Sequence, residues 1–436
     1  MKLKLHWQIL IAIVLAVGAG WVAGKETSIF GVTFYQSFDF IGKLFLNALK
    51  MIIVPLVMSS VITGIAGIGS SGALGRLGGK TLLYYLATSL FAILVGLALV
   101  NLFTPGIIDG QPAKEVLGQL DSNMVADVMS KVEGKGAGDV AEIFIRMFPP
   151  NIIKAAADNG QLLGIIVFSL FFGVFLTRIE EPFAETMYNF WQGLFQVMMK
   201  ITDLIIKFAP LGVFGLVAKV VAETDTGKLG DLASSLGVFF ITVLLALAVH
   251  VLVTLPLMLK FVARVNPWRH YRAMAPALLT AFSTSSSAST LPLTLECVEK
   301  NAGVSNRTTS FVLPLGATVN MDGTALYECV AAMFIAQAYG LDLSFATQFL
   351  VVTIALLTSI GVAAIPSASL VAITVILAAI GLPAEGIAMI MATDRILDMF
   401  RTAVNVFSDS CGAVIIGKLQ GETGILEENN VAEVTG

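Results

Sequence analysis

Six long apolar segments occupy most of the first 262 residues, and they constrain the fold more than any other feature of the sequence. They span roughly residues 7–24, 38–67, 80–104, 161–178, 190–221 and 234–262. Each is close to or longer than the roughly 20 residues that an α-helix needs to cross a bilayer. Because 56% of the residues are hydrophobic and only 13% are charged, we predict an all-α polytopic membrane protein.

Basic residues flank these segments at alternate ends and indicate their orientation. They are Lys2, Lys4, Arg76, Lys80, Lys260, Arg264, Arg269 and Arg272. The positive-inside rule then places both termini in the cytoplasm, and the short loops suggest a multi-pass protein of the inner (plasma) membrane. Pro55 and Pro210 are expected to kink their helices. The net charge of -4 argues against nucleic acid as a partner.

The pattern changes after about residue 270, where the apolar stretches become shorter and small polar residues interrupt them. Residues 283–290 are nearly all Ser and Thr, and apolar arms of about ten residues flank them. Residues 349–357 and 370–382 flank a second small-residue stretch in the same way. Arms of this length are too short to cross a bilayer alone. We therefore predict two re-entrant hairpins, each followed by a polar helix, which is the pattern of an inverted repeat.

Residues 316–324 carry Asn320 and Asp322 between two apolar segments. A carboxylate at bilayer depth is costly unless it pairs, meets a cation or lines a wet cavity. Gly316 and Gly323 allow the backbone to unwind there and to turn its carbonyl groups toward a positive charge. We predict a broken helix that holds a cation.

A polar stripe follows one face of the last long segment, residues 388–416. At about 100° per residue, the stripe contains Asp394, Asp398, Arg401, Thr402, Asn405 and Asp409. A carboxylate suits a ligand ammonium, and a guanidinium suits a ligand carboxylate. Asp398 and Arg401 together therefore fit an amino acid with an acidic side chain, and the alternative is an internal salt bridge that only packs helices.

The motifs of the second half resemble those of the dicarboxylate/amino-acid:cation symporter family, which includes archaeal aspartate transporters and animal excitatory amino-acid transporters. The resemblance covers nearly the whole chain. The matching runs are Ser285-Ser286-Ser287, Thr290-Leu291-Pro292, Asn320-Met321-Asp322-Gly323-Thr324, Ser359-Ile360-Gly361, Ile365-Pro366 and the stripe from Asp398 to Asp409. It implies a sodium-driven importer of acidic amino acids, aspartate or glutamate.

The resemblance also implies an architecture of eight transmembrane helices and two re-entrant hairpins in a homotrimer that works as an elevator. Its parts would be scaffold helices 1–2 (1–79), helix 3 of the transport domain (80–104), an extracellular connection (105–160), scaffold helices 4–5 (161–222), the rest of the transport domain (223–421) and a disordered cytoplasmic tail (422–436).

By the family pattern, one set of residues binds substrate. Arg401 would hold the side-chain carboxylate and Asp398 the ammonium, while Asn405 and Ser287 would hold the α-carboxylate. The remaining contacts would come from Thr324, Thr402, Ser369 and the backbone around Ile365.

The same pattern implies three sodium sites and no organic cofactor. The first would use Gly316, Asn320, Asn405 and Asp409. The second would use carbonyl groups of Thr318, Ser359 and Ile360. The third would use Tyr85, Thr88, Ser89, Asn320 and Asp322. A set of oxygen ligands fits a hard cation.

Several positions depart from the family pattern or bear on coupling. The arginines that relatives carry at the positions of Ser285 and Met399 are absent here. We expect Arg395 to neutralise Asp394, the alternative being that it extends toward an interface. Glu328 lies near the expected midplane, where burial favours a neutral carboxyl group. Proton coupling through Glu328 is therefore a hypothesis, and a structural hydrogen bond is the alternative.

Other function classes fit the sequence less well. A channel does not need an Asp–Arg pair that is spaced for a zwitterion, and no His lies near the Ser tract to activate a nucleophile, so we predict that the chain is not an enzyme. Two alternatives within the family stay open. They are a proton-coupled glutamate or C4-dicarboxylate symporter and a neutral amino-acid carrier.

Overall fold

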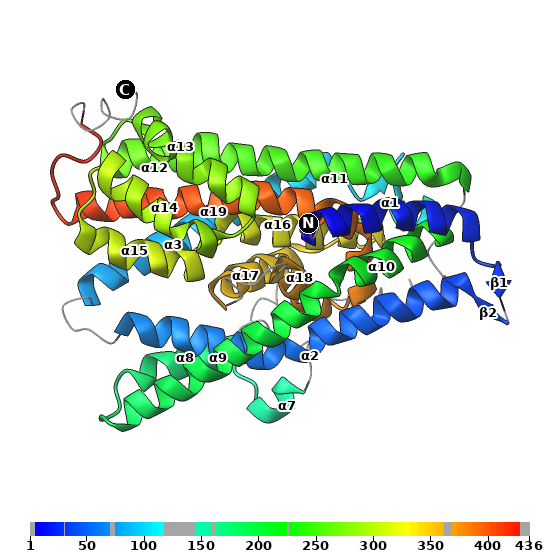
Figure 1. Ribbon diagram of the computed structural model, residues 1–436, viewed down its shortest axis with the longest axis horizontal. Helices are drawn as coiled ribbons and strands as arrows, with labels where there is room; N and C mark the ends of the chain where they lie inside the picture. The colour runs from blue at the N-terminus through cyan, green and yellow to red at the C-terminus, as the bar shows by residue number, and fades with distance from the viewer. Residues whose placement is uncertain are drawn as a thin grey trace.

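The computed structural model describes residues 5–29, 31–69, 75–116, 145, 147–157, 162–224, 226–361 and 368–427. The described chain is mostly helical (Figure 1), as the sequence predicts. Within these ranges the strands form two antiparallel pairs of two residues each. They are β1 (Ser28–Ile29) with β2 (Val32–Thr33), and β3 (Ile107–Ile108) with β4 (Gln111–Pro112).

Five helices pack together as a first group. They are α1 (Leu5–Ala23), α2 (Phe34–Gly69), α8 (Leu162–Leu176), α9 (Phe183–Lys207) and α10 (Ala209–Glu223). In this group α1 packs on α10, α10 on α2, and α2 on both α8 and α9. Figure 1 shows α2, α8 and α9 along the lower edge. A Cβ added at Gly215 would lie 2.8 Å from the Phe38 carbonyl oxygen, so small residues let these backbones approach closely.

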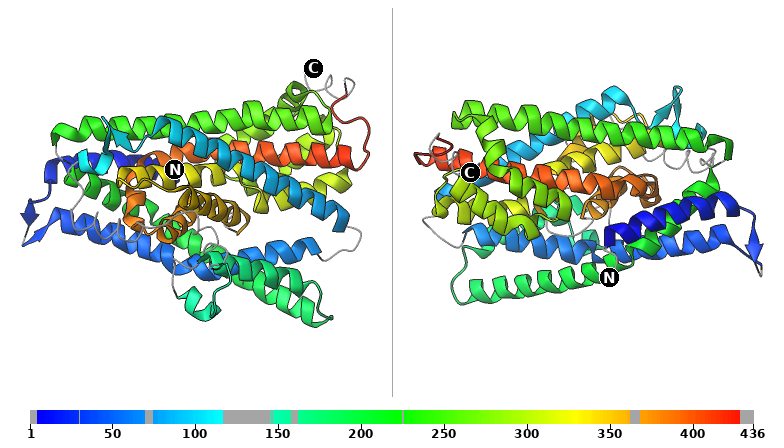
Figure 2. Two further views of the ribbon diagram at one scale, coloured as in Figure 1. Left: turned by 180° about the vertical axis from the view of Figure 1, so that it is seen from behind. Right: turned by 45° about the horizontal axis from the view of Figure 1, so that its top comes forward.

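A second group surrounds the last long helix. It contains α3 (Gly75–Phe103), α11 (Leu229–Val249), η3 (His250–Thr254), α12 (Leu255–Met258), η4 (Leu259–Ala263), α13 (Pro267–Thr284), α14 (Ser287–Glu296), η5 (Cys297–Asn301), α15 (Asn306–Val319), α16 (Asp322–Ala338), α17 (Phe345–Gly361), α18 (Ala368–Ala379), η6 (Ala384–Met389) and α19 (Met391–Leu419). Helix α19 contacts α3, α11, α13, α14, α15 and α16. Figure 2 shows it running through the interior of this group, so its polar stripe faces protein on several sides.

The remaining described elements are short and lie between the long helices. They are α4 (Ala113–Val116), α7 (Ile152–Ala156) and η2 (Thr226–Lys228). Much of the 105–160 connection lies outside the described residues. The division of the chain into scaffold and transport domains stays a prediction.

The predicted break at residues 316–324 is confirmed. Helix α15 ends at Val319, α16 begins at Asp322, and Asn320 and Met321 between them have extended or irregular backbone angles. The break therefore exposes backbone groups and the polar side chains of Asn320 and Asp322 inside the helix group. A ligand site in a discontinuous helix needs such groups.

Two packed helix pairs lie where the two hairpins are predicted, and their re-entry into the membrane stays a prediction. Helices α13 and α14 pack together and are joined by Ser285 and Ser286 alone. Ser285 adopts a left-handed φ of 50°, and the Ser286 side chain accepts a hydrogen bond from the Ser289 backbone N–H, so it caps α14. Helices α17 and α18 also pack together. The connection between them, residues 362–367 with Ile365 and Pro366, lies outside the described residues.

Fewer helices meet the length and composition of a membrane span than the sequence predicts. In the part of the chain that the structure describes, three qualify alone: Phe34–Gly67, Leu77–Phe103 and Leu229–Ala263. A fourth arises if α9 and α10 count as one span, bent by 53° beside Pro210. This bend confirms the kink predicted at Pro210, whereas α2 continues through Pro55. The count of eight membrane helices stays a prediction.

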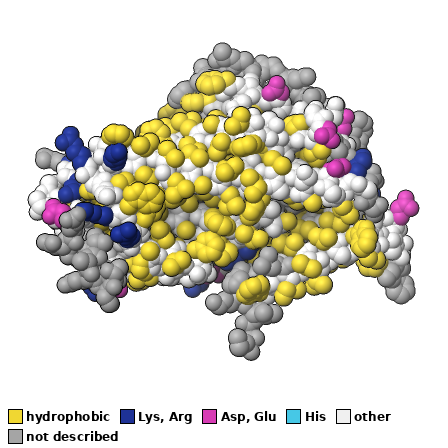
Figure 3. Space-filling view, turned by 90° about the horizontal axis from the view of Figure 1, so that it is seen from above, with side chains coloured by type: hydrophobic (Ala, Val, Ile, Leu, Met, Phe, Trp, Pro, Cys, Tyr) yellow, Lys and Arg dark blue, Asp and Glu magenta, His cyan; other side chains and the backbone are white. Residues whose placement is uncertain are grey.

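The distribution of side chains on one face fits a membrane protein. Figure 3 shows hydrophobic side chains across the middle of this face, Lys and Arg gathered toward one end, and acidic groups toward the other. The basic end is the end where α12 and α13 lie in Figure 1. Large exposed apolar residues include Phe40, Phe103 and Phe261. An apolar band between charged ends is the surface that a bilayer covers.

The tail predicted to be disordered from residue 422 is in fact packed as far as residue 427. Ile425 and Leu426 are buried. The Glu422 carboxylate accepts hydrogen bonds from the Ser305 backbone N–H and hydroxyl and from Thr308 at the start of α15. Burial opposes ionisation, but these hydrogen bonds hold the pKa of Glu422 below its usual value. The prediction of disorder was therefore wrong for 422–427, because this segment caps a helix, and 428–436 lies outside the described residues.

Candidate functional site

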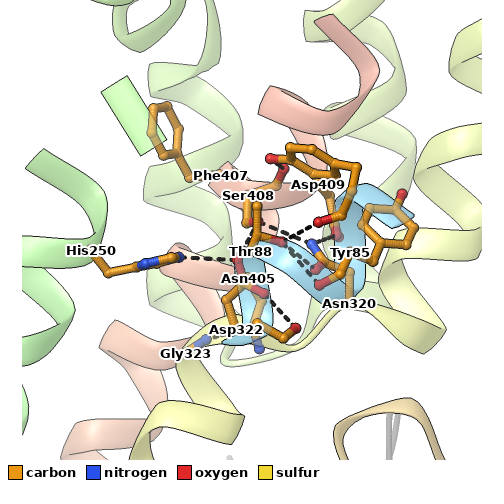
Figure 4. Close-up of polar contacts among 12 residues, drawn as sticks. Tyr85, Thr88, His250, Asn320, Asp322, Gly323, Asn405, Phe407, Ser408 and Asp409 are labelled. Carbon is orange, nitrogen blue, oxygen red and sulfur yellow. Dashed lines mark hydrogen bonds and ion pairs between the residues drawn. The ribbon is translucent and has the colours of Figure 1, made fainter. Parts of the chain in front are cut away.

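Asn320, at the break between α15 and α16, connects α3 to α19. Its side-chain oxygen accepts a hydrogen bond from the Thr88 hydroxyl of α3, at 3.3 Å. Its side-chain nitrogen donates to Asp409 Oδ1 at 2.8 Å and to Ser408 Oγ at 3.1 Å, both on α19. Figure 4 shows these three elements converging on the break. The broken helix thus gathers polar groups from positions far apart in the sequence.

Asp322 is fully buried and accepts hydrogen bonds from three different elements. Its Oδ1 accepts from Ser89 Oγ of α3 at 2.7 Å. Its Oδ2 lies 2.6 Å from Ser408 Oγ and 3.0 Å from His250 Nε2 (Figure 4). These contacts fix the carboxylate in one orientation, where its remaining lone pairs can face a ligand.

Asp409 and Tyr85 come close to Gly316, where a side chain would not fit. A Cβ added at Gly316 would lie 2.5 Å from Asp409 Oδ1 and 2.7 Å from the Tyr85 hydroxyl oxygen. That hydroxyl donates to the Val312 carbonyl oxygen at 2.7 Å. The glycine is therefore required by space, and it places the carboxylate directly against the α15 backbone.

If Gly316 and Asp409 belong to the sodium site that the family resemblance implies, Gly316→Ala should lower uptake about tenfold or more and raise the sodium concentration for half-maximal uptake. The added methyl group would push Asp409 and Tyr85 away from the break, and such overpacking costs about 1–3 kcal/mol. Sodium-driven uptake into proteoliposomes measures both quantities. Gly64→Ala is the matched control, because nothing lies within 4 Å of a Cβ there. Equal behaviour of the two variants would contradict this prediction.

Asn405 of α19 forms hydrogen bonds with the start of α16. Its Oδ1 accepts from the Gly323 backbone N–H at 2.8 Å, and its Nδ2 donates to Thr324 Oγ1 at 3.1 Å. Asn405 lies between Arg401 and Asp409 on one face of α19, with about 6 Å of helix axis between successive members. Asn405 therefore binds the start of α16 from a position one helical turn away from both Arg401 and Asp409.

Arg401 is the centre of a second cluster, also buried. Its Nη2 lies 3.0 Å from Asp394 Oδ1 and 3.0 Å from Asp398 Oδ1, and its Nη1 donates to Ser369 Oγ of α18 at 2.9 Å. Its Cζ sits 3.9 Å above the ring of Tyr327 from α16. The internal Asp398–Arg401 ion pair that the sequence left open is thus present, within a wider network.

The prediction that Arg395 neutralises Asp394 was wrong. Arg395 Nη1 pairs with Asp398 Oδ2 at 3.0 Å, while Asp394 pairs with Arg401. Adjacent helix residues point about 100° apart, whereas residues three or four apart share a face. Helix geometry therefore directs Arg395 toward Asp398 and not toward its neighbour in sequence.

Some predicted site residues are not joined to these clusters by a described contact between side chains. Thr402 and Ser359 give their hydroxyl hydrogens to backbone carbonyls of their own helices. Ser287 is the first residue of α14 and is half-buried. The side chains of Thr318, Ile360 and Ile365 lie outside what the structure describes. The predicted second sodium site, formed by carbonyl groups near these residues, stays a prediction.

Three residues of the clusters were not predicted from the sequence. One is Tyr327, whose ring lies under Arg401. Ser408 bridges Asn320 and Asp322, and its position next to Asp409 in the polar stripe was a usable signal. His250, in the π-helical turn η3, is fully buried against Asp322. An imidazole inside an apolar span is itself a sign of a partner, but only the structure identifies that partner.

Glu328 is fully buried nearly two turns into α16, and only one of its oxygens has a hydrogen bond. Its Oε2 accepts from Thr358 Oγ1 of α17 at 2.8 Å, and Oε1 has no hydrogen-bond partner. The structural hydrogen bond that is the alternative to proton coupling is present, but its donor is Thr358 and not the Tyr or Ser neighbour that we expected. The oxygen without a partner is a site where a proton can reside without disturbing an ion pair.

A broken helix and three buried or half-buried arginine–aspartate ion pairs inside a group of apolar helices are features typical of membrane transporters. The model of the sodium:dicarboxylate symporter family matches residues 5–419. The chain belongs to this family. The family member described here is therefore a multi-pass membrane transporter of the symporter class and not an enzyme.

Relatives of this symporter occur in animals and bacteria. Excitatory amino acid transporter 3 of Mus musculus is 35% identical, over 96% of this chain and 86% of that protein. The proton/sodium-glutamate symport protein of Bacillus subtilis (strain 168) is 36% identical, over 96% of this chain and 94% of its own length. A putative sodium-dependent excitatory amino acid transporter of Caenorhabditis elegans, glt-4, is 36% identical over 94% of this chain and 88% of its own.

Proposed function

We propose that this symporter imports acidic amino acids, glutamate and aspartate, together with sodium. The observation that carries the proposal is an imbalance of buried charge. Among the described residues, no Lys or Arg side chain pairs with Asp322 or Asp409, although both residues are at least 97% buried, and the basic group at Asp322 is the imidazole of His250. Buried carboxylates without a compensating cation are costly, so this cluster suits a metal cation with oxygen ligands.

The Arg401 cluster supplies the complementary recognition of substrate. Its two guanidinium and two carboxylate groups sum to no net charge, and they lie on the same face of α19 as the cation cluster. In this proposal Arg401 binds the side-chain carboxylate and Asp398 the ammonium. Asn405, Ser287, Thr324, Thr402, Ser369 and the backbone at Ile365 complete the site.

Sodium would bind at three places in this proposal. The first is Gly316, Asn320, Asn405 and Asp409; the second is the carbonyl groups of Thr318, Ser359 and Ile360; the third is Tyr85, Thr88, Ser89, Asn320 and Asp322. Because Asn405 contacts both Gly323 and Thr324, a cation that orders Asn405 also orders the substrate side of α16. Shared residues of this kind produce reciprocal coupling between two ligands.

The architecture proposed for this function follows the two helix groups. The group of α1, α2, α8, α9 and α10 would be a scaffold, and the group around α19 a transport domain that moves as an elevator in a homotrimer. The basic end of the molecule (Figure 3) would face the cytoplasm of the cell, and the bilayer would be the inner (plasma) membrane.

The decisive experiment is uptake of labelled aspartate into proteoliposomes that hold the purified protein. An inward sodium gradient should drive accumulation, and dissipating that gradient with a sodium ionophore should abolish it. Liposomes without protein and a choline gradient are the controls. Uptake that ignores sodium and follows a proton gradient would assign the coupling ion to the proton. Uptake of serine or alanine alone would identify a neutral amino-acid carrier.

Proton coupling is the second candidate, and Glu328 with its unpaired Oε1 supports it. If Glu328 carries a proton with substrate, Glu328→Gln should flatten the pH dependence of uptake between about pH 6 and 8, because glutamine does not titrate. Uptake rates at fixed sodium across this range test it, with exposed Glu296→Gln as control. A variant with the wild-type pH profile would leave Glu328 with a structural role.

A further inference from the structure

Asp398 is held by two arginines in this structure. Arg395, three residues before it, donates from Nη1 to Oδ2 at 3.0 Å. Arg401, three residues after it, donates from Nη2 to Oδ1 at 3.0 Å. Each carboxylate oxygen therefore already has a guanidinium partner. A substrate ammonium that binds Asp398 must share an oxygen with one of these arginines or displace it.

The two arginines differ in how readily they can release Asp398. The Arg401 side chain is 1% exposed and keeps Asp394, Ser369 and the Tyr327 ring as partners. The side chains of Arg395 and Asp398 are both 19% exposed, the most open pair of the network. Nε has no hydrogen-bond partner in either arginine, so the difference lies in exposure and in the additional partners of Arg401. Arg395 is thus the arginine that can move when a ligand cation arrives.

Movement of Arg395 changes the charge balance at Asp398, and this affects whether the site favours ligands with or without an ammonium group. With Arg395 in place, Asp398 is neutralised and does not repel a ligand with two carboxylates. When an ammonium group occupies Asp398, the guanidinium is no longer needed there. A dicarboxylic acid without an amino group cannot supply that cation. Its carboxylates would lie near the negative charge of Asp398, and like charges placed together in a binding site cost several kcal/mol. Binding of such a ligand therefore depends on Arg395.

We propose that Arg395 is a positioning residue that takes the place of the substrate ammonium at Asp398 and thereby sets the discrimination between acidic amino acids and dicarboxylic acids that lack an amino group. This inference rests on the proposed function, because it takes Arg401 and Asp398 as the substrate site. It predicts that the wild-type site accepts both ligand types and that Arg395 favours the ligand without the amino group.

Three C4 compounds test the contribution of the ammonium group. Aspartate, malate and succinate share one carbon chain and two carboxylates, and they differ at C2 by an ammonium, a hydroxyl or a hydrogen. Sodium-driven uptake of labelled aspartate into proteoliposomes is measured against each unlabelled compound. In the wild type, we expect inhibition constants for malate and succinate within about 100-fold of that for aspartate, a difference of under about 3 kcal/mol.

Arg395→Gln should move the two ligand types in opposite directions. Aspartate should bind more tightly, because its ammonium no longer competes with a guanidinium, and succinate should bind more weakly against an Asp398 with one arginine fewer. We expect the succinate-to-aspartate ratio of inhibition constants to rise at least about tenfold, or about 1.4 kcal/mol. Arg395→Lys, which keeps the positive charge, should bring the ratio back toward the wild-type value.

Three results would overturn the inference. One is a wild type that takes aspartate but is indifferent to millimolar succinate and malate, which needs no variant. Another is an Arg395→Gln variant in which affinities for aspartate and succinate fall together, as a structural role requires. The third is an Arg395→Lys variant whose ratio matches Arg395→Gln. A wild type that does not transport aspartate at all would instead refute the proposed function.

Discussion

Replacing Arg401 with threonine should lower the affinity for aspartate and glutamate at least about 100-fold, because a substrate carboxylate in a dry site would lose its cation, at a cost of several kcal/mol. The same variant should accept neutral amino acids such as serine, since the pocket would then no longer contain the group that requires an acidic side chain. Competition of unlabelled amino acids with labelled substrate in proteoliposomes measures both changes.

The Arg401→Thr variant needs a test of folding, because it removes a buried partner from Asp394 and Asp398. Elution as a single species in detergent and transport of serine would both report a folded protein. Arg307→Thr, at an exposed arginine near the start of α15, is the control for loss of one guanidinium. Aspartate transport by Arg401→Thr with wild-type affinity would show that Arg401 does not bind the substrate.

Replacing Asp322 with asparagine should nearly abolish sodium-driven uptake at physiological sodium. The change removes a full negative charge from the cation cluster. In the wild type, the hydroxyl groups of Ser89 and Ser408 donate hydrogen bonds to this carboxylate. The asparagine would replace one acceptor oxygen with an amide nitrogen, which is itself a donor. Breaking a buried charged contact costs about 3–5 kcal/mol, which predicts a loss of at least about 100-fold in apparent sodium affinity.

The sodium dependence of uptake is the measurement that separates this effect from general damage. Raising sodium should partly restore uptake by Asp322→Asn, and aspartate binding should weaken only through its coupling to sodium. Asp342→Asn, at an exposed aspartate in the loop after α16, controls for the change in charge. An Asp322→Asn variant with wild-type sodium dependence would exclude this carboxylate from the cation site.

Much of the candidate site could be predicted because its information is local in the sequence. The break at 316–324 follows from polar residues and glycines inside an apolar run, and the structure has it between Val319 and Asp322. The polar stripe on α19 follows from helical periodicity, and the structure places Arg401, Asn405 and Asp409 in buried clusters. Local patterns of this kind depend only on backbone geometry, which is the same in every helix.

The ion-pair partners of the residues on the polar stripe of α19 could not be predicted from the list of its residues alone. The prediction from sequence assigned Arg395 to Asp394 or to an interface, whereas the structure pairs it with Asp398, because i,i+3 neighbours share a helix face. Similarly, the tail after α19 looked like a solvated acidic segment. Glu422 instead caps α15, which begins more than a hundred residues earlier in the chain.

The amino-acid sequence was enough to establish a helical membrane protein, the place where a helix breaks, and the residues that supply buried charge. Apolar length, helical period and the cost of burying charge act within one segment, so they can be read along the chain. The tertiary structure alone decided that His250 and Ser408 both meet Asp322 and that the ring of Tyr327 lies against Arg401. Such contacts depend on how separate helices pack, and no local pattern encodes the distance between segments that the chain brings together.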